Sequence, residues 1–153
     1  MNIISRPATA SDIDIIVEFN AAMAKETENL ELDRERLQKG TEALIADSSN
    51  GIYYVAEADG KVVGQLMITY EWSDWRNGTF WWIQSVYVQP EYRERGIFRS
   101  LYRYVESIAR NRGVVCGLRL YVDQSNKRAQ QTYEALGMKH SHYQIMDTDF
   151  VLK

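Results

Sequence analysis

The stretch that most restricts the fold runs from Thr79 to Val122, and it predicts a strand, a helix and a second strand in that order. Residues 79–89 are rich in aromatic and β-branched side chains and stop at Pro90, as expected of a strand. Gly96 then opens a segment with apolar residues at helical spacing. A strand, a crossover helix and a strand form a right-handed parallel pair. We therefore expect such a pair at the centre of a sheet.

Local patterns predict the remaining elements in the same way. Ser11 and Asp14 form a capping-box-like pair at the start of a first helix. The other expected elements are a strand at Ile3 and Ile4, a helix over 33–46, an antiparallel pair over 52–57 and 61–72, a helix over 126–136, and one or two final strands over 138–152. The sequence thus predicts an α/β fold, in which about four helices flank a mixed, mostly antiparallel sheet of six to seven strands. One domain is expected over residues 1–153.

Composition excludes several classes of protein. A formal net charge of -3 argues against a broad phosphate-binding face, so no nucleic-acid partner is expected. No apolar run is long enough to cross a membrane, which predicts a cytoplasmic protein without a membrane partner. The single cysteine, Cys116, rules out an intrachain disulfide. His140 and His142 lack a third clear ligand, so no metal is expected.

The loop after residues 79–89 carries the strongest local chemical signal. It reads Arg93-Glu94-Arg95-Gly96 and leads directly into the next expected helix. Free backbone N–H groups and the positive end of the helix dipole favour an anion at such a place, and the arginines add positive charge. The loop by itself predicts a phosphate site, or equally a strand-to-helix turn with solvated arginines.

A second element, residues 126–138 after the next strand, sharpens the interpretation. Together the two elements resemble the GCN5-related N-acetyltransferase family. In this chain Arg93, Gly96 and Phe98 occupy the defining positions of that family's pyrophosphate loop. Phe98 departs from the glycine or alanine of the family, and Glu94 stands where many members have glycine. The resemblance implies the acyl-CoA N-acyltransferase fold with a splayed parallel strand pair, and acetyl-coenzyme A as cofactor.

The same resemblance assigns residues to the cofactor and to catalysis. It implies that the backbone of residues 86–88 pairs with the pantetheine arm and that Tyr133 faces the sulfur. A tyrosine stays protonated at neutral pH and can therefore donate to a departing thiolate, while Tyr133 is otherwise a core aromatic of its helix. The full set expected to bind cofactor is Val86, Tyr87, Val88, Arg93, Glu94, Arg95, Gly96, Ile97, Phe98 and Asn126.

The acceptor side is less determined by the sequence. All four tryptophans lie near one hairpin, where alternation prevents them from all entering the core. Tryptophan faces and carboxylates suit a cationic amine, and Arg76 suits a substrate carboxylate. No general base is assigned, although Glu71, Asp74 and Glu28 are options. The residues expected on the acceptor side are Glu28, Glu71, Trp72, Asp74, Trp75, Arg76, Trp82 and Gln84.

The function expected from these residues is direct transfer of an acetyl group to the amine of a small metabolite or amino-acid-like compound. Two alternatives stay open: acetylation of a peptide or protein, and a non-catalytic acyl-CoA sensor. The aromatic hairpin is also consistent with a rigid surface or with a homodimer contact.

Overall fold

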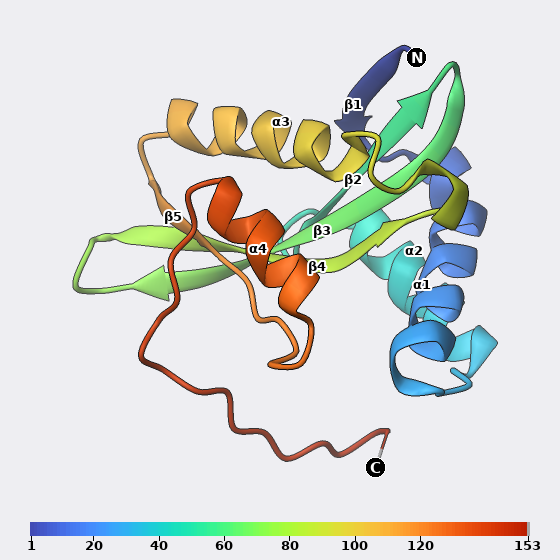
Figure 1. The fold of residues 1–153 in the computed structure, drawn as a ribbon. Helices are drawn as coiled ribbons and strands as arrows, with labels where there is room; N and C mark the ends of the chain where they lie inside the picture. Colours follow the sequence, from blue (N-terminus) through green and yellow to red (C-terminus); the bar gives the residue numbers. More distant parts are fainter. Residues whose placement is uncertain (153) are drawn as a thin grey trace. The chain divides into compact units, whose positions relative to one another are not determined.

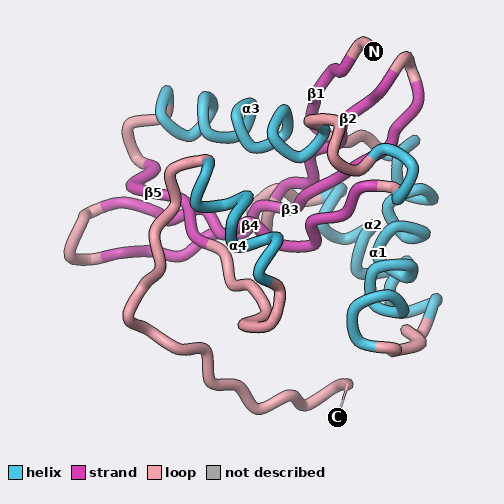
Figure 2. The backbone as a smooth tube through the Cα atoms, viewed as in Figure 1, coloured by secondary structure: helices cyan, strands magenta, loops and turns pink. Residues whose placement is uncertain are grey.

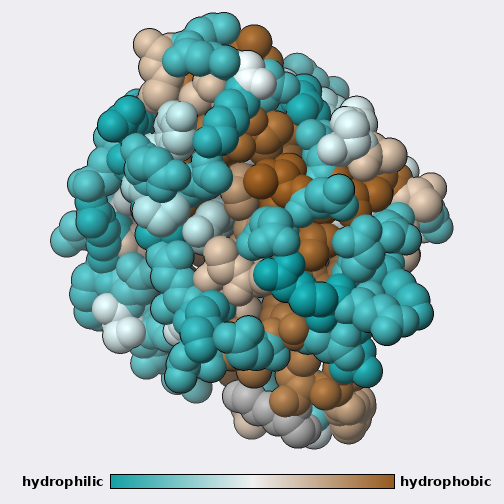
Figure 3. Space-filling model, turned by 90° about the vertical axis from the view of Figure 1, so that its right-hand side faces the viewer, coloured by the Kyte–Doolittle hydropathy of each residue, from teal (hydrophilic) through white to brown (hydrophobic). Residues whose placement is uncertain are grey.

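The computed structural model describes residues 1–152. The chain forms two compact units, Met1–Leu120 and Tyr121–Lys153, and the expectation of a single domain stays a prediction. Within the described residues, no helix is both long and apolar enough to cross a membrane. Hydrophilic residues cover much of the face drawn in Figure 3, with hydrophobic groups exposed between them.

The first unit is built on one five-stranded sheet, whose order follows the order of the strands in the sequence. The first three neighbour pairs are antiparallel and the last, between β4 and β5, is parallel. This confirms the mixed, mostly antiparallel α/β fold (Figure 1). The strands are β1 (Ile3–Pro7), β2 (Ile52–Ala58), β3 (Lys61–Ser73), β4 (Gly78–Val88) and β5 (Val115–Arg119).

Helices cover both faces of this sheet. On one face, Ile16 of α1 packs against Tyr53 and Val55 of β2, and on the other Tyr54 meets Tyr104 of α3 edge to face. These neighbours in β2 point to opposite faces because side chains alternate along a strand. The helices are α1 (Ile13–Glu28), α2 (Arg34–Ala46) and α3 (Ile97–Asn111), with single 3-10 turns at Ala10–Asp12 and Pro90–Tyr92.

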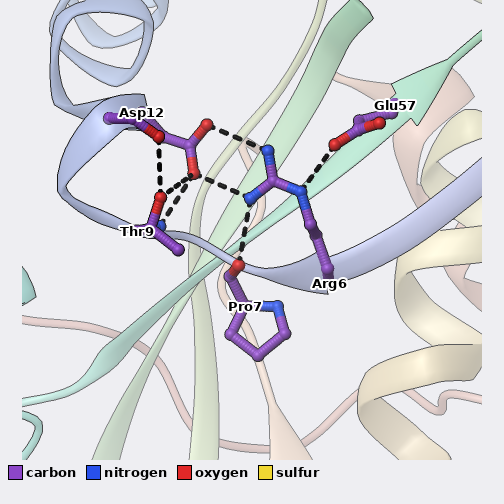
Figure 4. A network of polar contacts seen from close by, with 6 residues as sticks. Arg6, Pro7, Thr9, Asp12 and Glu57 are labelled. Carbon is purple, nitrogen blue, oxygen red and sulfur yellow. Dashed lines mark hydrogen bonds and ion pairs between the residues drawn. The ribbon is translucent and has the colours of Figure 1, made fainter. Parts of the chain in front are cut away.

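An ion-pair network fixes the start of α1 to β1 (Figure 4). Both terminal nitrogens of Arg6 donate to the buried carboxylate of Asp12, at 2.8 and 3.0 Å, and its Nε donates to Glu57 at 2.6 Å. The capping box is formed by Thr9 and Asp12, whose Oδ2 accepts from the Thr9 N–H at 2.8 Å. The expected box at Ser11 and Asp14 is therefore wrong, because Asp12 is drawn to Arg6 and starts the helical turn earlier.

The second unit contains α4 (Lys127–Ala135), within one residue of the expected helix at each end. Residues 139–152 hold no helix or strand (Figure 2), so the one or two final strands expected there are absent from the described residues. Most apolar side chains of this segment are exposed, so it buries no strand-like apolar face. The sheet consequently has five strands instead of six or seven.

The parallel pair was expected at the centre of the sheet, and that position is wrong. In the described residues β5 is the last strand of the order, and β4 lies between it and β3. No strand follows β5 among the described residues, so the pair stands at the edge of the sheet.

Candidate active site

The middle of β4 is irregular at Ser85. Pairing with β3 advances from Met67–Gln84 to Gln65–Tyr87, so β4 carries one extra residue there. Ser85 has a φ of 52°, in the left-handed region that non-glycine residues rarely adopt. A bulge of this kind bends its strand and leaves a residue unpaired in the ladder. Such strain costs on the order of 1–3 kcal/mol and persists only where the surroundings enforce it.

A buried polar network lies against this bulge. The Gln65 side chain, with no exposed surface, donates through Nε2 to the Ser85 carbonyl oxygen at 3.0 Å and to Asn20 Oδ1 at 3.4 Å. Asn20 Nδ2 in turn donates to the Tyr53 hydroxyl at 3.1 Å. Burial raises the pKa of Tyr53. The Gln65 amide thus links the Ser85 carbonyl of β4 to Asn20 of α1, and Asn20 in turn links to Tyr53 of β2.

The outer edge of β4 opens just before the bulge. Pairing with β5 is recorded from Thr79 to Trp82, and β5 ends at Arg119 opposite Trp82. Among the described residues, no strand pairs with that edge over residues 83–88. An unpaired strand edge is the kind of backbone to which an extended ligand can add as a further strand. Val86, Tyr87 and Val88, all expected to bind cofactor, lie in this segment.

The loop that follows β4 forms the N-terminus of α3. Gly96 is its N-cap with a φ of 85°, and the space where a Cβ would stand is open. The first hydrogen bond of the helix runs from the Ser100 N–H to the Gly96 carbonyl oxygen at 3.0 Å. The N–H groups before Ser100 therefore lack acceptors inside the helix. Such N–H groups and the helix dipole favour an anion, so the loop over residues 93–98 stays a predicted anion site.

The Arg93 side chain is directed to α1. Its Nη1 and Nη2 donate to the two carboxylate oxygens of Glu26, at 2.6 and 3.1 Å, and its Nε donates to the Val88 carbonyl oxygen at 2.8 Å. Hydrogen bonding from Arg93 lowers the pKa of Glu26. Sequence reasoning missed Glu26, because a partner 67 residues away leaves no local pattern.

Several predicted acceptor-side residues share one face of the sheet. Thr69 pairs with Trp82 in register, and Gln84 Nε2 donates to Thr69 Oγ1. Glu71 Oε1 accepts from Trp82 Nε1 at 3.0 Å and from Arg119 Nη1 at 2.7 Å. A hydrogen bond from Trp82, and to a smaller extent one from Arg119, lowers the pKa of Glu71. A lower pKa makes Glu71 a weaker general base.

The other predicted acceptor-side residues lie elsewhere in the first unit. Trp72 and Trp75 are 62% and 86% exposed at the end of the β3–β4 hairpin, whereas Trp81 is buried. The tryptophans are therefore not all core, as expected. Asp74 accepts from the Trp75 N–H at 2.9 Å, and Glu28 is the exposed last residue of α1.

The two predicted site residues of the second unit are both placed by α4. Asn126 is its N-cap, and its Oδ1 accepts from the Ala129 N–H at 3.0 Å. Tyr133 is half-buried, and burial raises the pKa of its phenol. A raised pKa keeps the hydroxyl protonated at neutral pH, as a proton donor requires.

Replacing Glu94 by glycine is expected to tighten the binding of acetyl-coenzyme A. Glycine removes a negative charge beside the predicted anion site, whereas the relief of the left-handed strain at the Glu94 φ of 63° stabilises the free and the bound protein alike. We expect affinity to rise about threefold to tenfold at low salt, and less at high salt. Calorimetric titration measures it.

Two control variants separate the causes of that effect. Glu94→Gln removes the charge and keeps the strain, while Asn29→Gly relieves a similar φ of 51° at the end of α1. Equal affinity of the wild type and both Glu94 variants would contradict an anion site at this loop.

Comparison with known proteins gives consistent results. The model of the acetyltransferase (GNAT) family matches residues 18–138. The thialysine N-epsilon-acetyltransferase of Sus scrofa is 32% identical over 130 residues, which are 76% of this chain and 75% of that enzyme. The same enzyme of Bos taurus is 39% identical over 77 residues, 50% of this chain and 44% of that enzyme.

Solved structures agree in fold. A possible acetyltransferase from Clostridium difficile 630 superimposes with a TM-score of 0.89 at 46% identity, covering 99% of both chains. AAC(6')-Iy, solved in complex with the bisubstrate analog CoA-S-monomethyl-acetylneamine, has a TM-score of 0.76 at 16% identity. It covers 97% of this chain and 99% of that chain, and at this identity the likeness concerns the fold alone.

Proposed function

Because the chain belongs to the acetyltransferase (GNAT) family, whose members use acetyl-coenzyme A, we propose that it acetylates the amine of a small, amino-acid-like molecule. The observation that carries this proposal is that no described strand pairs with the outer edge of β4 over residues 83–88, and that this strand is followed by the N-terminus of α3. An extended cofactor with a pyrophosphate needs both features. The thialysine enzymes named above supply the precedent for a small-molecule amine.

The residues present fit acetyl-coenzyme A, which would supply an activated acetyl thioester. Backbone N–H groups of Arg95, Gly96 and Ile97 would hold the pyrophosphate, with Arg93 adding charge. The β4 edge at Val86 to Val88 would hold the pantetheine arm, and its N–H groups would stabilise negative charge on the thioester oxygen. Glu94, Phe98 and Asn126 complete the proposed cofactor set.

The chemistry is a direct transfer without an acyl-enzyme. The amine nitrogen forms a bond to the acetyl carbon while the C–S bond breaks. Of the two protons lost by the ammonium group, one passes to solvent and one ends on the sulfur. Tyr133 is proposed as the donor to the sulfur, and Tyr133→Phe should lower kcat about 10²-fold with little change in KM.

The first experiment is a calorimetric titration with acetyl-coenzyme A and free coenzyme A, followed by thiol release with a panel of amines. We expect binding in the micromolar range and a loss of about 10²-fold in Gly96→Glu, because a side chain there meets the bound phosphate and strains the loop. Turnover without a partner protein supports the enzyme over a non-catalytic sensor.

Gly60→Glu is the matched control. Gly60 lies in the β2–β3 turn with the same φ of 85° and equally open space around it, so both variants carry the same backbone strain. An equal loss of affinity in the two variants, or no binding by the wild type, would overturn the proposal. Turnover with peptides alone would favour the peptide acetyltransferase.

A homodimer in the cytoplasm, without nucleic-acid partners, completes the proposal. The exposed Trp72 and Trp75 of the hairpin support a protein contact. Light scattering at micromolar protein checks the mass, and a monomer would remove this part of the proposal.

A further inference from the structure

A carboxylate of α1 fixes the start of the loop that follows β4. Glu26, two residues before the end of α1, accepts from Nη1 and Nη2 of Arg93 at 2.6 and 3.1 Å. The Nε of Arg93 donates to the Val88 carbonyl oxygen at 2.8 Å. Val88 is the last residue of β4, so one guanidinium joins α1 to the point where the strand becomes the loop.

Aromatic contacts support the same junction. The guanidinium carbon of Arg93 lies 5.3 Å from the centroid of the Tyr87 ring, and that centroid lies 5.2 Å from the centroid of Phe19. Phe19 and Glu26 are two helical turns apart, so they lie on one side of α1. This side of the helix therefore contacts the end of β4 at Tyr87 and the loop at Arg93.

The charge of Glu26 is unfavourable beside an anion site. A carboxylate repels a bound phosphate, so electrostatics alone predicts that Glu26 weakens cofactor binding. The side chains of Arg93 and Glu26 are 39% and 43% exposed, so water and salt screen this repulsion. Geometry acts in the opposite direction, because a bidentate pair with a third hydrogen bond to Val88 fixes the guanidinium in one orientation.

We infer, on the basis of the proposed function, that Glu26 is a positioning residue for cofactor binding, which acts by fixing Arg93 and, through it, the end of β4. The expected effect has the opposite sign to that of the charge. Removal of Glu26 weakens the binding of acetyl-coenzyme A, although it also removes a negative charge. A small displacement within a site is enough to cause such a loss.

Two variants of Glu26 separate geometry from charge in a calorimetric titration with acetyl-coenzyme A. Glu26→Ala and Glu26→Gln remove the same charge, but glutamine keeps one oxygen that can accept from Arg93. We expect Kd to rise about tenfold in Glu26→Ala and about threefold in Glu26→Gln, with ratios to the wild type that persist at high salt. Simple repulsion predicts instead that both variants bind equally and more tightly than the wild type.

A double-mutant cycle tests whether Glu26 acts through Arg93. In an Arg93→Ala background, Glu26→Ala should not weaken binding further, because the side chain that Glu26 fixes is already absent. Losses that multiply in the double variant would mean that Glu26 acts by another route.

Glu31→Ala is the matched control. Glu31 pairs with Lys25 of α1 at 3.1 Å and its side chain is 82% exposed, so the variant removes one carboxylate near the same end of α1. Its Kd for acetyl-coenzyme A should change by less than about twofold. Thermal melting checks that every variant is folded at the temperature of the titration.

Three outcomes overturn the inference. Unchanged or tighter binding in Glu26→Ala, or multiplying losses in the cycle, defeats it while the proposed acetyltransferase stands. Absence of binding by the wild type defeats both together.

Discussion

Replacing Gln65 by leucine is expected to lower kcat/KM for acetyl-coenzyme A by a factor of ten or more. The change removes the donor that holds the strained Ser85 carbonyl, while side-chain volume is nearly kept. The bulge can then relax and shift the edge of β4 at Val86. A displacement of about 1 Å in a site can cost 10²-fold in rate. Steady-state kinetics with acetyl-coenzyme A varied at saturating amine measures the effect.

Thermal melting of the same variant separates a positional cause from general destabilisation. Gln65 also carries a buried Oε1 without a recorded hydrogen-bond partner, and leucine removes that unfavourable atom. We therefore expect a change in unfolding free energy of no more than about 1–2 kcal/mol.

Thr41→Val is the matched control for Gln65→Leu. Thr41 is equally buried, and its hydroxyl donates to the Leu37 carbonyl oxygen at 2.9 Å within α2. It should lose about 1 kcal/mol of stability and keep its kinetics. Wild-type kinetic constants in Gln65→Leu would show that the network does not position β4.

Replacing Asp12 by asparagine is expected to lower the free energy of unfolding at pH 7 by about 3 kcal/mol. Asp12 is buried, whereas the side chain of Arg6 is 31% exposed and keeps Glu57 as a partner, so the loss lies at the low end of the roughly 3–5 kcal/mol typical of breaking buried pairs. Urea unfolding at pH 7 measures the loss. Glu35→Gln, in an exposed pair with Lys39, should cost less than about 0.5 kcal/mol.

The same pair predicts a pH dependence. Hydrogen bonding from Arg6 lowers the pKa of Asp12 below that of the unfolded chain. Its stabilisation is therefore present above the unfolded pKa of about 3.9 and is lost as the pH falls through the lower folded pKa. The difference between wild type and Asp12→Asn should shrink as the pH falls below 4. A difference that stays constant to pH 2 would contradict the ion-pair account.

Local patterns predicted the elements that local physics controls. Pro90 cannot continue a strand, so the end of β4 at Val88 was predictable to within one residue. Gly96 was recognised as a helix start, and its positive φ explains why a glycine is needed there. The proposed anion site rests on the loop between these two residues.

Long-range contacts were not predictable in this way. No local pattern marks Gln65 as buried, yet it has no exposed surface, because Asn20 and Ser85 supply its partners from distant segments. Arg119 was missed because its partner, Glu71, lies 48 residues earlier and meets it only through strand register. The prediction of final strands was wrong for a related reason, since apolar composition alone does not determine whether a segment pairs with a sheet.

The bond between Arg93 and Glu26 makes the cofactor loop and the end of α1 thermodynamically linked. If a bound phosphate attracts the Arg93 guanidinium, the ion pair between Arg93 and Glu26 of α1 is weakened. Linkage is reciprocal, so a ligand at the end of α1 that changes the affinity of the loop for a phosphate would have its own affinity changed by the same factor.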